Sequence, residues 1–195
     1  MRLSEPRVPP IEPADWGDDE RRGLGAEGAE LQANLGGGEV FNVLKTMVHH
    51  PDLCAAWMGF SKHLLFDQTL PPREREMAIL RIGWLCQSGY EFGQHILISQ
   101  KAGLTREEIR AVAEGPDAPG WNDHERTLLR AVDELHGDAF ISDAVYRKLS
   151  AVYDTRQIMD LVFTVGQYNM LSMALNTLGV QLDPGVPEYR EYLAL

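Results

Sequence analysis

The chain has 195 residues, of which 44% are hydrophobic and 24% charged, a composition suited to one globular domain with its own core. Its 18 basic and 29 acidic residues leave a formal net charge of -11, which repels a phosphate backbone, so we expect no nucleic-acid partner. No stretch approaches the roughly 20 apolar residues that span a bilayer, and the opening MRLSEPRVPPIEP lacks the apolar stretch of a secretory signal. We therefore expect a cytoplasmic protein without a membrane partner.

The two cysteines, Cys54 and Cys86, lie in the apolar contexts DLCAAWM and GWLCQSG. Two such residues do not make a disulfide framework. Reduced, buried thiols are expected.

The N-terminal residues 1–38 are expected to form an irregular arm with one short helix around 18–31, because prolines are frequent and the segment ends in GGG. The pattern then becomes helical, and no alternating strand pattern of useful length occurs. Residues 73–87 are almost continuously apolar, but their length fits a buried helix better than a strand. The expected fold is all-α with seven or eight helices: 41–50, 51–66, 73–87, from 88, from 105, 122–137, 142–152 and 155–178.

Helix starts are marked by capping boxes, in which a short polar side chain is followed three residues later by Glu or Gln. Four pairs have this spacing: Ser88 with Glu91, Thr105 with Glu108, Asn122 with Glu125, and Asp154 with Gln157. We expect a helix to begin at each of them. With these boundaries, 39–183 is the expected helical domain and 184–195 a C-terminal tail.

Candidate chemistry gathers in SGYEFGQH, residues 88–95. On a helix that begins near Ser88, this residue, Glu91 and His95 share one face. The preceding apolar helix carries Glu76 and Arg81, and a charge in such a place must find a partner or line a cavity. If the two helices form a hairpin, Glu76 can reach the imidazole of His95.

The stretch LPPREREMAILRIGWLCQSGYEFGQHILISQKAGLTREEIRAVAEG, residues 70–115, resembles the carboxymuconolactone decarboxylase family, which includes the AhpD-like alkylhydroperoxidases. Looser similarity continues to NTLGVQLDP at 176–184. The resemblance implies an AhpD-like helical bundle with a central helical hairpin, assembled as a homo-oligomer, commonly a trimer or hexamer.

The peroxidase branch of this family has a glutamate, a C-x-x-C pair twelve residues later, and a histidine four residues after the second cysteine. On that pattern Glu76 and His95 occupy the glutamate and histidine positions, whereas Ser88 and Glu91 stand where the cysteines would be. Thiol-dependent peroxide reduction needs an attacking thiolate and, in that branch, a resolving thiol. Cys86 lies two positions before the first cysteine's place, about 200° round a helix, and does not simply substitute.

Without the cysteine pair, Glu76 and His95 resemble the acid-base unit of the decarboxylase branch, which acts without a cofactor. The implied function is a lyase or isomerase acting on a small, anionic carboxylated lactone or enolisable acid. His95 would donate the proton and Glu76 would orient it. Free N–H groups at the helix start near Ser88 would attract an anion.

Four further residues are candidates for substrate binding: Ser88, Glu91, Arg81 and Tyr90. Each has a structural alternative, namely a helix cap for Ser88 and Glu91, an ion pair for Arg81 and core packing for Tyr90. No second ligand pair accompanies Glu76, Glu91 and His95, so we expect neither a metal nor a cofactor. Two other functions remain open: a peroxidase-related protein that uses Cys86, and a non-catalytic oligomeric binding protein.

Overall fold

The computed structural model describes residues 2–34 and 38–194, and within them the chain forms ten α-helices and no strand. Eight of these helices have seven or more residues, so the expected all-α fold is confirmed. The helices are α1 (Asp18–Asn34), α2 (Asn42–Met47), α3 (Pro51–Lys62), α4 (Pro72–Leu85), α5 (Gly89–Lys101), α6 (Arg106–Glu114), α7 (Asp123–Asp138), α8 (Asp143–Leu149), α9 (Thr155–Leu178) and α10 (Tyr189–Ala194). A π-helical turn, η2 (His63–Asp67), extends α3.

Three of the four predicted capping boxes are present. Thr105, Asn122 and Asp154 each accept a hydrogen bond from the backbone three residues later, and each receives the reciprocal side chain. These caps begin α6, α7 and α9.

None of the described helices combines the length and hydropathy needed to cross a membrane.

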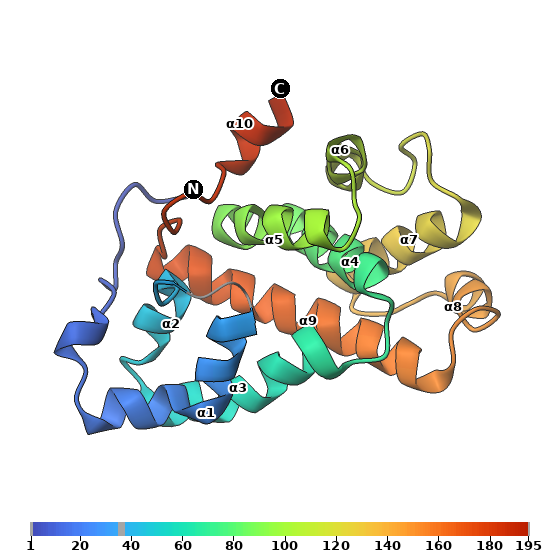
Figure 1. Cartoon of the computed structure of the whole chain (residues 1–195). Helices are drawn as coiled ribbons and strands as arrows, with labels where there is room; N and C mark the ends of the chain where they lie inside the picture. The colour runs from blue at the N-terminus through green and yellow to red at the C-terminus, as the bar shows by residue number, and fades with distance from the viewer. Residues whose placement is uncertain (1, 35–37, 195) are drawn as a thin grey trace.

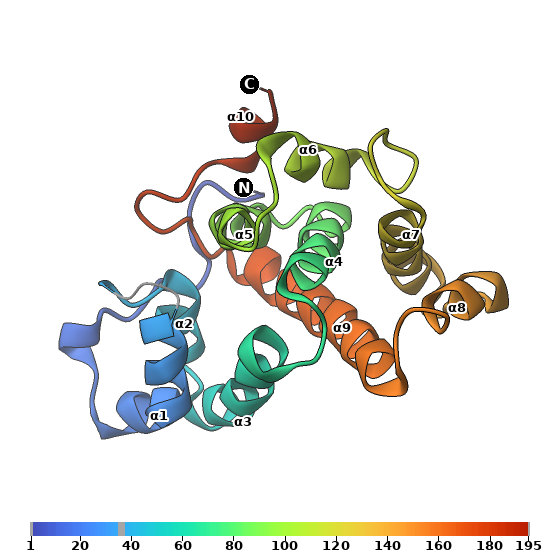
Figure 2. The same cartoon turned by 45° about the vertical axis from the view of Figure 1, so that its right-hand side comes forward.

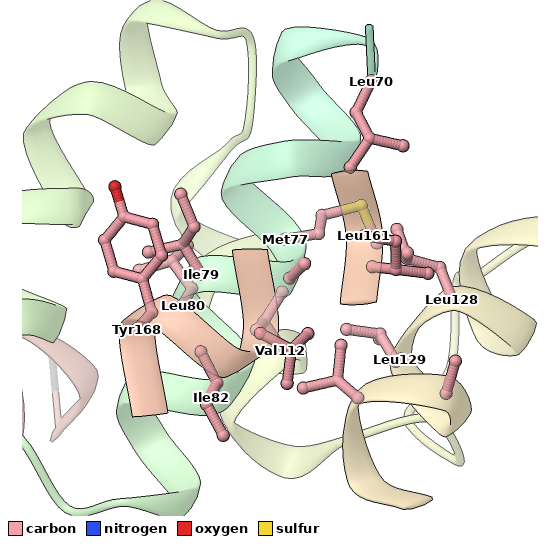
Figure 3. Close-up of a cluster of buried hydrophobic side chains, with 14 of the residues drawn as sticks. Leu70, Met77, Ile79, Leu80, Ile82, Val112, Leu128, Leu129, Leu161 and Tyr168 are labelled. Atoms are coloured by element: carbon pink, nitrogen blue, oxygen red, sulfur yellow. The ribbon is translucent and has the colours of Figure 1, made fainter. Parts of the chain in front are cut away.

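Helix α4 lies at the centre of the main bundle, between α5, α7 and the long helix α9 (Figure 2). Its residues from Met77 to Ile82 are all buried, as the apolar run predicted. Burial of the apolar residues among them supplies the main driving force for this part of the fold. Figure 3 shows the contacts around them: Met77, Ile79, Leu80 and Ile82 of α4 meet Val112 of α6, Leu128 and Leu129 of α7, and Leu161 of α9.

In the N-terminal segment, the short helix expected around 18–31 is present as α1, which is interrupted by the non-helical backbone of Gly25 and packs along α3 (Figure 1). Trp16 and Leu31 are buried with residues of α2 and α3 in a second hydrophobic cluster. Glycines permit this contact: a Cβ at Gly23 would lie 2.8 Å from Cα of Pro51. Gly23 therefore allows α1 and α3 to approach closely, whereas most of the GGG run that suggested an arm lies outside the described residues.

The expected C-terminal tail also contains structure. Helix α10 covers most of its second half, and Tyr189 is buried against Trp84 of α4 and Phe92 of α5, with ring centroids 5.9 and 5.7 Å away. At the other end of the chain, the backbone N–H groups of Arg7 and Val8 donate to the carbonyl of Leu178 at the end of α9. Both terminal segments are thus fixed against the bundle.

Candidate active site

The hairpin of α4 and α5 brings Glu76, Glu91 and His95 together. His95 Nδ1 lies 2.6 Å from Oε2 of Glu76, as the spacing predicted, and His95 Nε2 lies 3.1 Å from Oε1 of Glu91. Both ring nitrogens therefore face a carboxylate. An imidazole can donate to two acceptors only when both nitrogens carry a proton, so this geometry favours the imidazolium.

Burial intensifies these interactions. Glu76 is completely buried, and Glu91 and His95 are each 4% exposed. The second oxygen of Glu76 accepts a 2.9 Å hydrogen bond from Nε of Arg75. Two cations and two carboxylates thus form one buried network without excess charge, which offsets much of the desolvation cost.

The pKa of His95 is raised to about 9. Burial acts in the opposite direction, because desolvation disfavours the charged ring, but the charges and hydrogen bonds of Glu76 and Glu91 outweigh it. At neutral pH His95 therefore holds a proton that it can transfer.

His95 and Glu91 lie in the wall of a cavity of about 580 Å³. Glu76 is not part of the wall and contacts His95 from behind. The cavity lies between the main bundle and the N-terminal cluster, and its wall is mainly apolar. The residues that line it come from α1 (Leu31), the α2 region (Phe41, Val43, Leu44), α3 and η2 (Trp57, Ser61, Leu65), α5 (Tyr90, Glu91, Gln94, His95, Leu97, Ile98, Gln100, Lys101), α9 (Gln167, Tyr168, Leu171) and the loop after α9 (Asp183, Pro184, Val186).

Tyr90, a predicted substrate-binding residue, does reach the cavity wall, but its hydroxyl group is occupied. It donates to Oδ2 of Asp183 at 2.5 Å and accepts from the backbone N–H of Val43 at 3.2 Å. Gln94 donates to the same Asp183 oxygen, and the backbone N–H of Asn42 donates to the other at 2.7 Å. This cluster joins α5, the start of α2 and the loop after α9 around the cavity.

The capping box predicted for Ser88 and Glu91 is wrong. Ser88 occupies the N-cap position of α5, but its side chain caps nothing, and its buried Oγ has no hydrogen-bond partner in the described part of the protein. Glu91 points instead to His95, because a buried imidazolium attracts a carboxylate more strongly than a backbone N–H does. Ser88 does not line the cavity.

Arg81 is held away from the cavity. Its guanidinium group binds Asp133 of α7 through two hydrogen bonds of 2.6 and 3.0 Å, and donates to the carbonyls of Val112 and Ala113 at the end of α6. All of these contacts are structural. The sequence offered an ion pair as the alternative for Arg81, and the geometry agrees with it.

Cys86 also lies outside the cavity wall. Its Sγ donates to Oδ1 of Asn169 at 3.0 Å, and burial raises the pKa of the thiol. A thiol with a raised pKa is a poor nucleophile at neutral pH. Sγ also lies 3.9 Å from Nδ1 of His136, but burial has the larger effect on the thiol, so this environment does not activate Cys86 for peroxide reduction.

Several wall residues could not be found from the sequence. Trp57 and Leu31 are apolar residues without a chemical motif, and Gln167, Tyr168 and Asp183 lie more than 70 residues from His95. Tyr168 contacts His95 edge to face, with the ring centroids 5.1 Å apart.

Among the residues that the structure describes, no group of three His, Cys, Asp or Glu side chains is arranged to hold a metal ion.

Three solved structures share this fold. One is an uncharacterised peroxidase-related protein from Ralstonia eutropha with an alkylhydroperoxidase AhpD core: 21% identity, TM-score 0.77, covering 97% of this chain and 95% of that one. The second is a variant of the debrominase Bmp8 in complex with 2,3,4-tribromopyrrole. It is 17% identical, with a TM-score of 0.77, and the match covers 98% of this chain and 97% of that one. The third is an uncharacterised peroxidase-related protein from Silicibacter. It is 16% identical, with a TM-score of 0.76, and the match covers 94% of this chain and 97% of that one.

No curated protein matches the sequence. The sequence model of the Carboxymuconolactone decarboxylase family, however, matches residues 51–134, which include α4, α5 and the Glu76, Glu91 and His95 triad. The likeness to the solved structures, at this level of identity, extends to the AhpD-like fold. Residues 51–134 of the chain thus match the carboxymuconolactone decarboxylase family, and the described chain has an AhpD-like fold, with no C-x-x-C pair in its sequence.

Proposed function

We propose that the protein is a cofactor-independent lyase or isomerase that uses His95 as a general acid toward an enolisable carboxylic substrate. The observation that carries the proposal is the position of His95, which lies in the cavity wall with its two ring nitrogens held by Glu76 and Glu91. Groups whose pKa is shifted by specific charged partners beside a cavity are typical of catalytic sites.

In a decarboxylation, the bond to the departing carbon dioxide breaks and its electron pair remains on the substrate as an enolate. A proton must then reach the enolate carbon. His95 supplies it from Nε2, the nitrogen shared with Glu91, while Glu76 keeps hold of Nδ1. An isomerase would use the same donor after removal of a proton elsewhere, for which Glu91 is the nearest base.

Tyr168 suits the stabilisation of the enolate oxygen. Burial raises the pKa of this phenol well above its usual value, with the charges of Glu91 and Glu76 adding to the effect, so it stays protonated and can donate a hydrogen bond. A donor that is preorganised beside a developing negative charge lowers the barrier of such reactions.

The direct test is turnover of 4-carboxymuconolactone, followed by its ultraviolet absorbance. His95→Gln should lower kcat by about 100-fold to 10,000-fold, the usual contribution of general acid catalysis. The matched control is His136→Gln, which changes an exposed histidine in the last turn of α7 and should leave kcat unchanged. Activity that survives His95→Gln contradicts the mechanism.

A non-catalytic role is less well supported. It requires residues 88–95 to do no more than begin a helix, yet Ser88 forms no side-chain cap and Glu91 is directed to His95 beside a cavity.

We also infer that the protein assembles with copies of itself through α9. Five of its apolar side chains are between 37% and 59% exposed, and they form one stripe at helical spacing: Met159, Val162, Phe163, Met170 and Met173. No charged residue occurs from Leu161 to Leu178. Depletion of charge around exposed apolar side chains is typical of the centre of a protein interface.

Phe163→Glu should shift the molar mass measured by light scattering from the oligomer to a smaller species. Tyr146→Glu is the matched control, because Tyr146 is similarly exposed, at 47%, but lies on α8. An oligomer that tolerates Phe163→Glu would exclude α9 as the interface.

A further inference from the structure

One charged side chain in the cavity wall has neither an ion pair nor a side-chain hydrogen bond among the residues that the structure describes. Of its ionisable side chains, Glu91 is paired with His95, and Asp183 is bound by Tyr90, Gln94 and Asn42. Lys101, in the last turn of α5, has no ion-pair partner among the described residues. The charge available to a ligand is therefore a cation.

Lys101 and the acid-base residues occupy opposite ends of the same wall. Glu91, Gln94, Ile98 and Lys101 follow one face of α5 at helical spacing, and all four line the cavity. Lys101 lies six positions after His95, which corresponds to about 9 Å along the helix axis. A ligand that touches both must span roughly that distance.

The space between the two ends is apolar. Leu97 and Ile98 of α5 form one side, and Leu31, Phe41 and Leu65 are among the residues that form the rest. The volume of about 580 Å³ lies within the range of sites that enclose drug-sized ligands, so a single small lactone would leave much of it unfilled.

We propose that the ligand of this cavity is an amphipathic carboxylic acid, with its carboxylate beside Lys101 and its apolar body between Lys101 and His95. The opposite end, which carries the enolisable group and, for a decarboxylation, a second carboxylate that departs as carbon dioxide, then reaches His95. That last assignment rests on the proposed function, whereas the recognition of an apolar body and a carboxylate does not require any turnover.

Calorimetric titration of the full-length protein with octanoate, butanoate and octan-1-ol tests the proposal. Each methylene group that enters the apolar cavity tightens binding by about fourfold, so octanoate should bind at least tenfold more tightly than butanoate. It should also bind more tightly than octan-1-ol, and this advantage should decrease as salt is added.

Lys101→Gln should weaken octanoate binding by about fivefold, which corresponds to the largest free energy usual for an exposed ion pair. It should leave octan-1-ol binding unchanged. Lys101→Arg should restore the affinity. The matched control is Lys148→Gln, because Lys148 is an exposed lysine on α8 and does not line this cavity. It should bind octanoate as the unmodified protein does.

Three results would each overturn the proposal: no octanoate binding, equal binding of octanoate and butanoate, or equal binding of octanoate and octan-1-ol. A loss in Lys101→Gln that affects octan-1-ol as much as octanoate would also overturn it. The two proposals fail separately. Octanoate binding without carboxymuconolactone turnover contradicts the proposed reaction alone, and turnover without octanoate binding contradicts the ligand class alone.

Discussion

Helix α4 buries two charged side chains five residues apart, and the structure holds them in different ways. Glu76 is directed to α5, where it binds a histidine that lines the cavity. Arg81 is directed to α7 and α6, where it binds Asp133 and two carbonyls remote from the cavity. A buried charge in a sequence therefore indicates a partner, but only the neighbouring helix decides whether that partner serves chemistry or folding.

The two charged side chains also differ in the kind of group that each of them binds. Arg81 completes the carbonyl end of α6, which would otherwise be left without donors in the interior. Glu76 acts on a group whose charge varies with pH. Substitution of each should therefore affect different measurable quantities.

The largest expected effect is on stability. Arg81→Met should lower the free energy of unfolding by about 3–5 kcal/mol, because it leaves Asp133 and two carbonyls without their buried partner. Chemical denaturation measures this loss. Arg130→Met is the control, since Arg130 forms an exposed pair with Asp117 and should change stability by less than about 1 kcal/mol. Similar losses in the two variants would contradict the structural role of Arg81.

Glu76→Gln should act mainly through pH. The pKa of His95 is raised from 6.5 to about 9 in the folded protein, so its contribution to stability is full below pH 6.5 and is lost as the pH rises through 9. Removing one of the two carboxylates should lower this pKa and flatten that decline. NMR titration of the imidazole, with denaturation at several pH values, measures both.

The control for this experiment is Glu30→Gln, which removes a carboxylate from an exposed pair with Lys62. It should leave the titration of His95 unchanged. A titration midpoint of His95 that is the same with and without Glu76 would show that the buried contact does not set its charge.

The smallest expected effect is at the start of α5. Ser88→Ala should change the free energy of unfolding by less than about 0.5 kcal/mol, because the hydroxyl group caps nothing. Thr105→Ala removes a complete capping box from α6 and should cost about 1 kcal/mol. If Ser88→Ala destabilised the protein as much as Thr105→Ala, the hydroxyl would have to cap α5 in solution.

The sequence predicted features that depend on local spacing. Each of the three capping boxes follows from residues three apart in the sequence. The buried helix with its two charges and the contact between Glu76 and His95 follow from residues within one helical hairpin. The mistaken box at Ser88 has the same spacing as the correct ones. What distinguishes it is that Glu91 lies beside a buried imidazolium, a tertiary contact that local rules do not contain.

The rest of the cavity depends on contacts between distant segments. Leu31 comes from the N-terminal cluster, Gln167 from α9 and Asp183 from the loop after α9, and all three lie far from α5 in the sequence. The close approach of α1 to α3 at Gly23 could not be predicted, because glycine is also common in irregular segments. Only the packed structure distinguishes the two.

The division of the cavity between two sources has a consequence for how such proteins diversify. The acid-base residues lie within residues 51–134, the part that matches the family, whereas much of the opposite wall comes from before and after it. The proposed proton donor and much of the apolar wall that faces it are thus encoded in separate stretches of the sequence. Exchange of the flanking stretches between relatives should change which molecule is accepted and leave the proton donor in place.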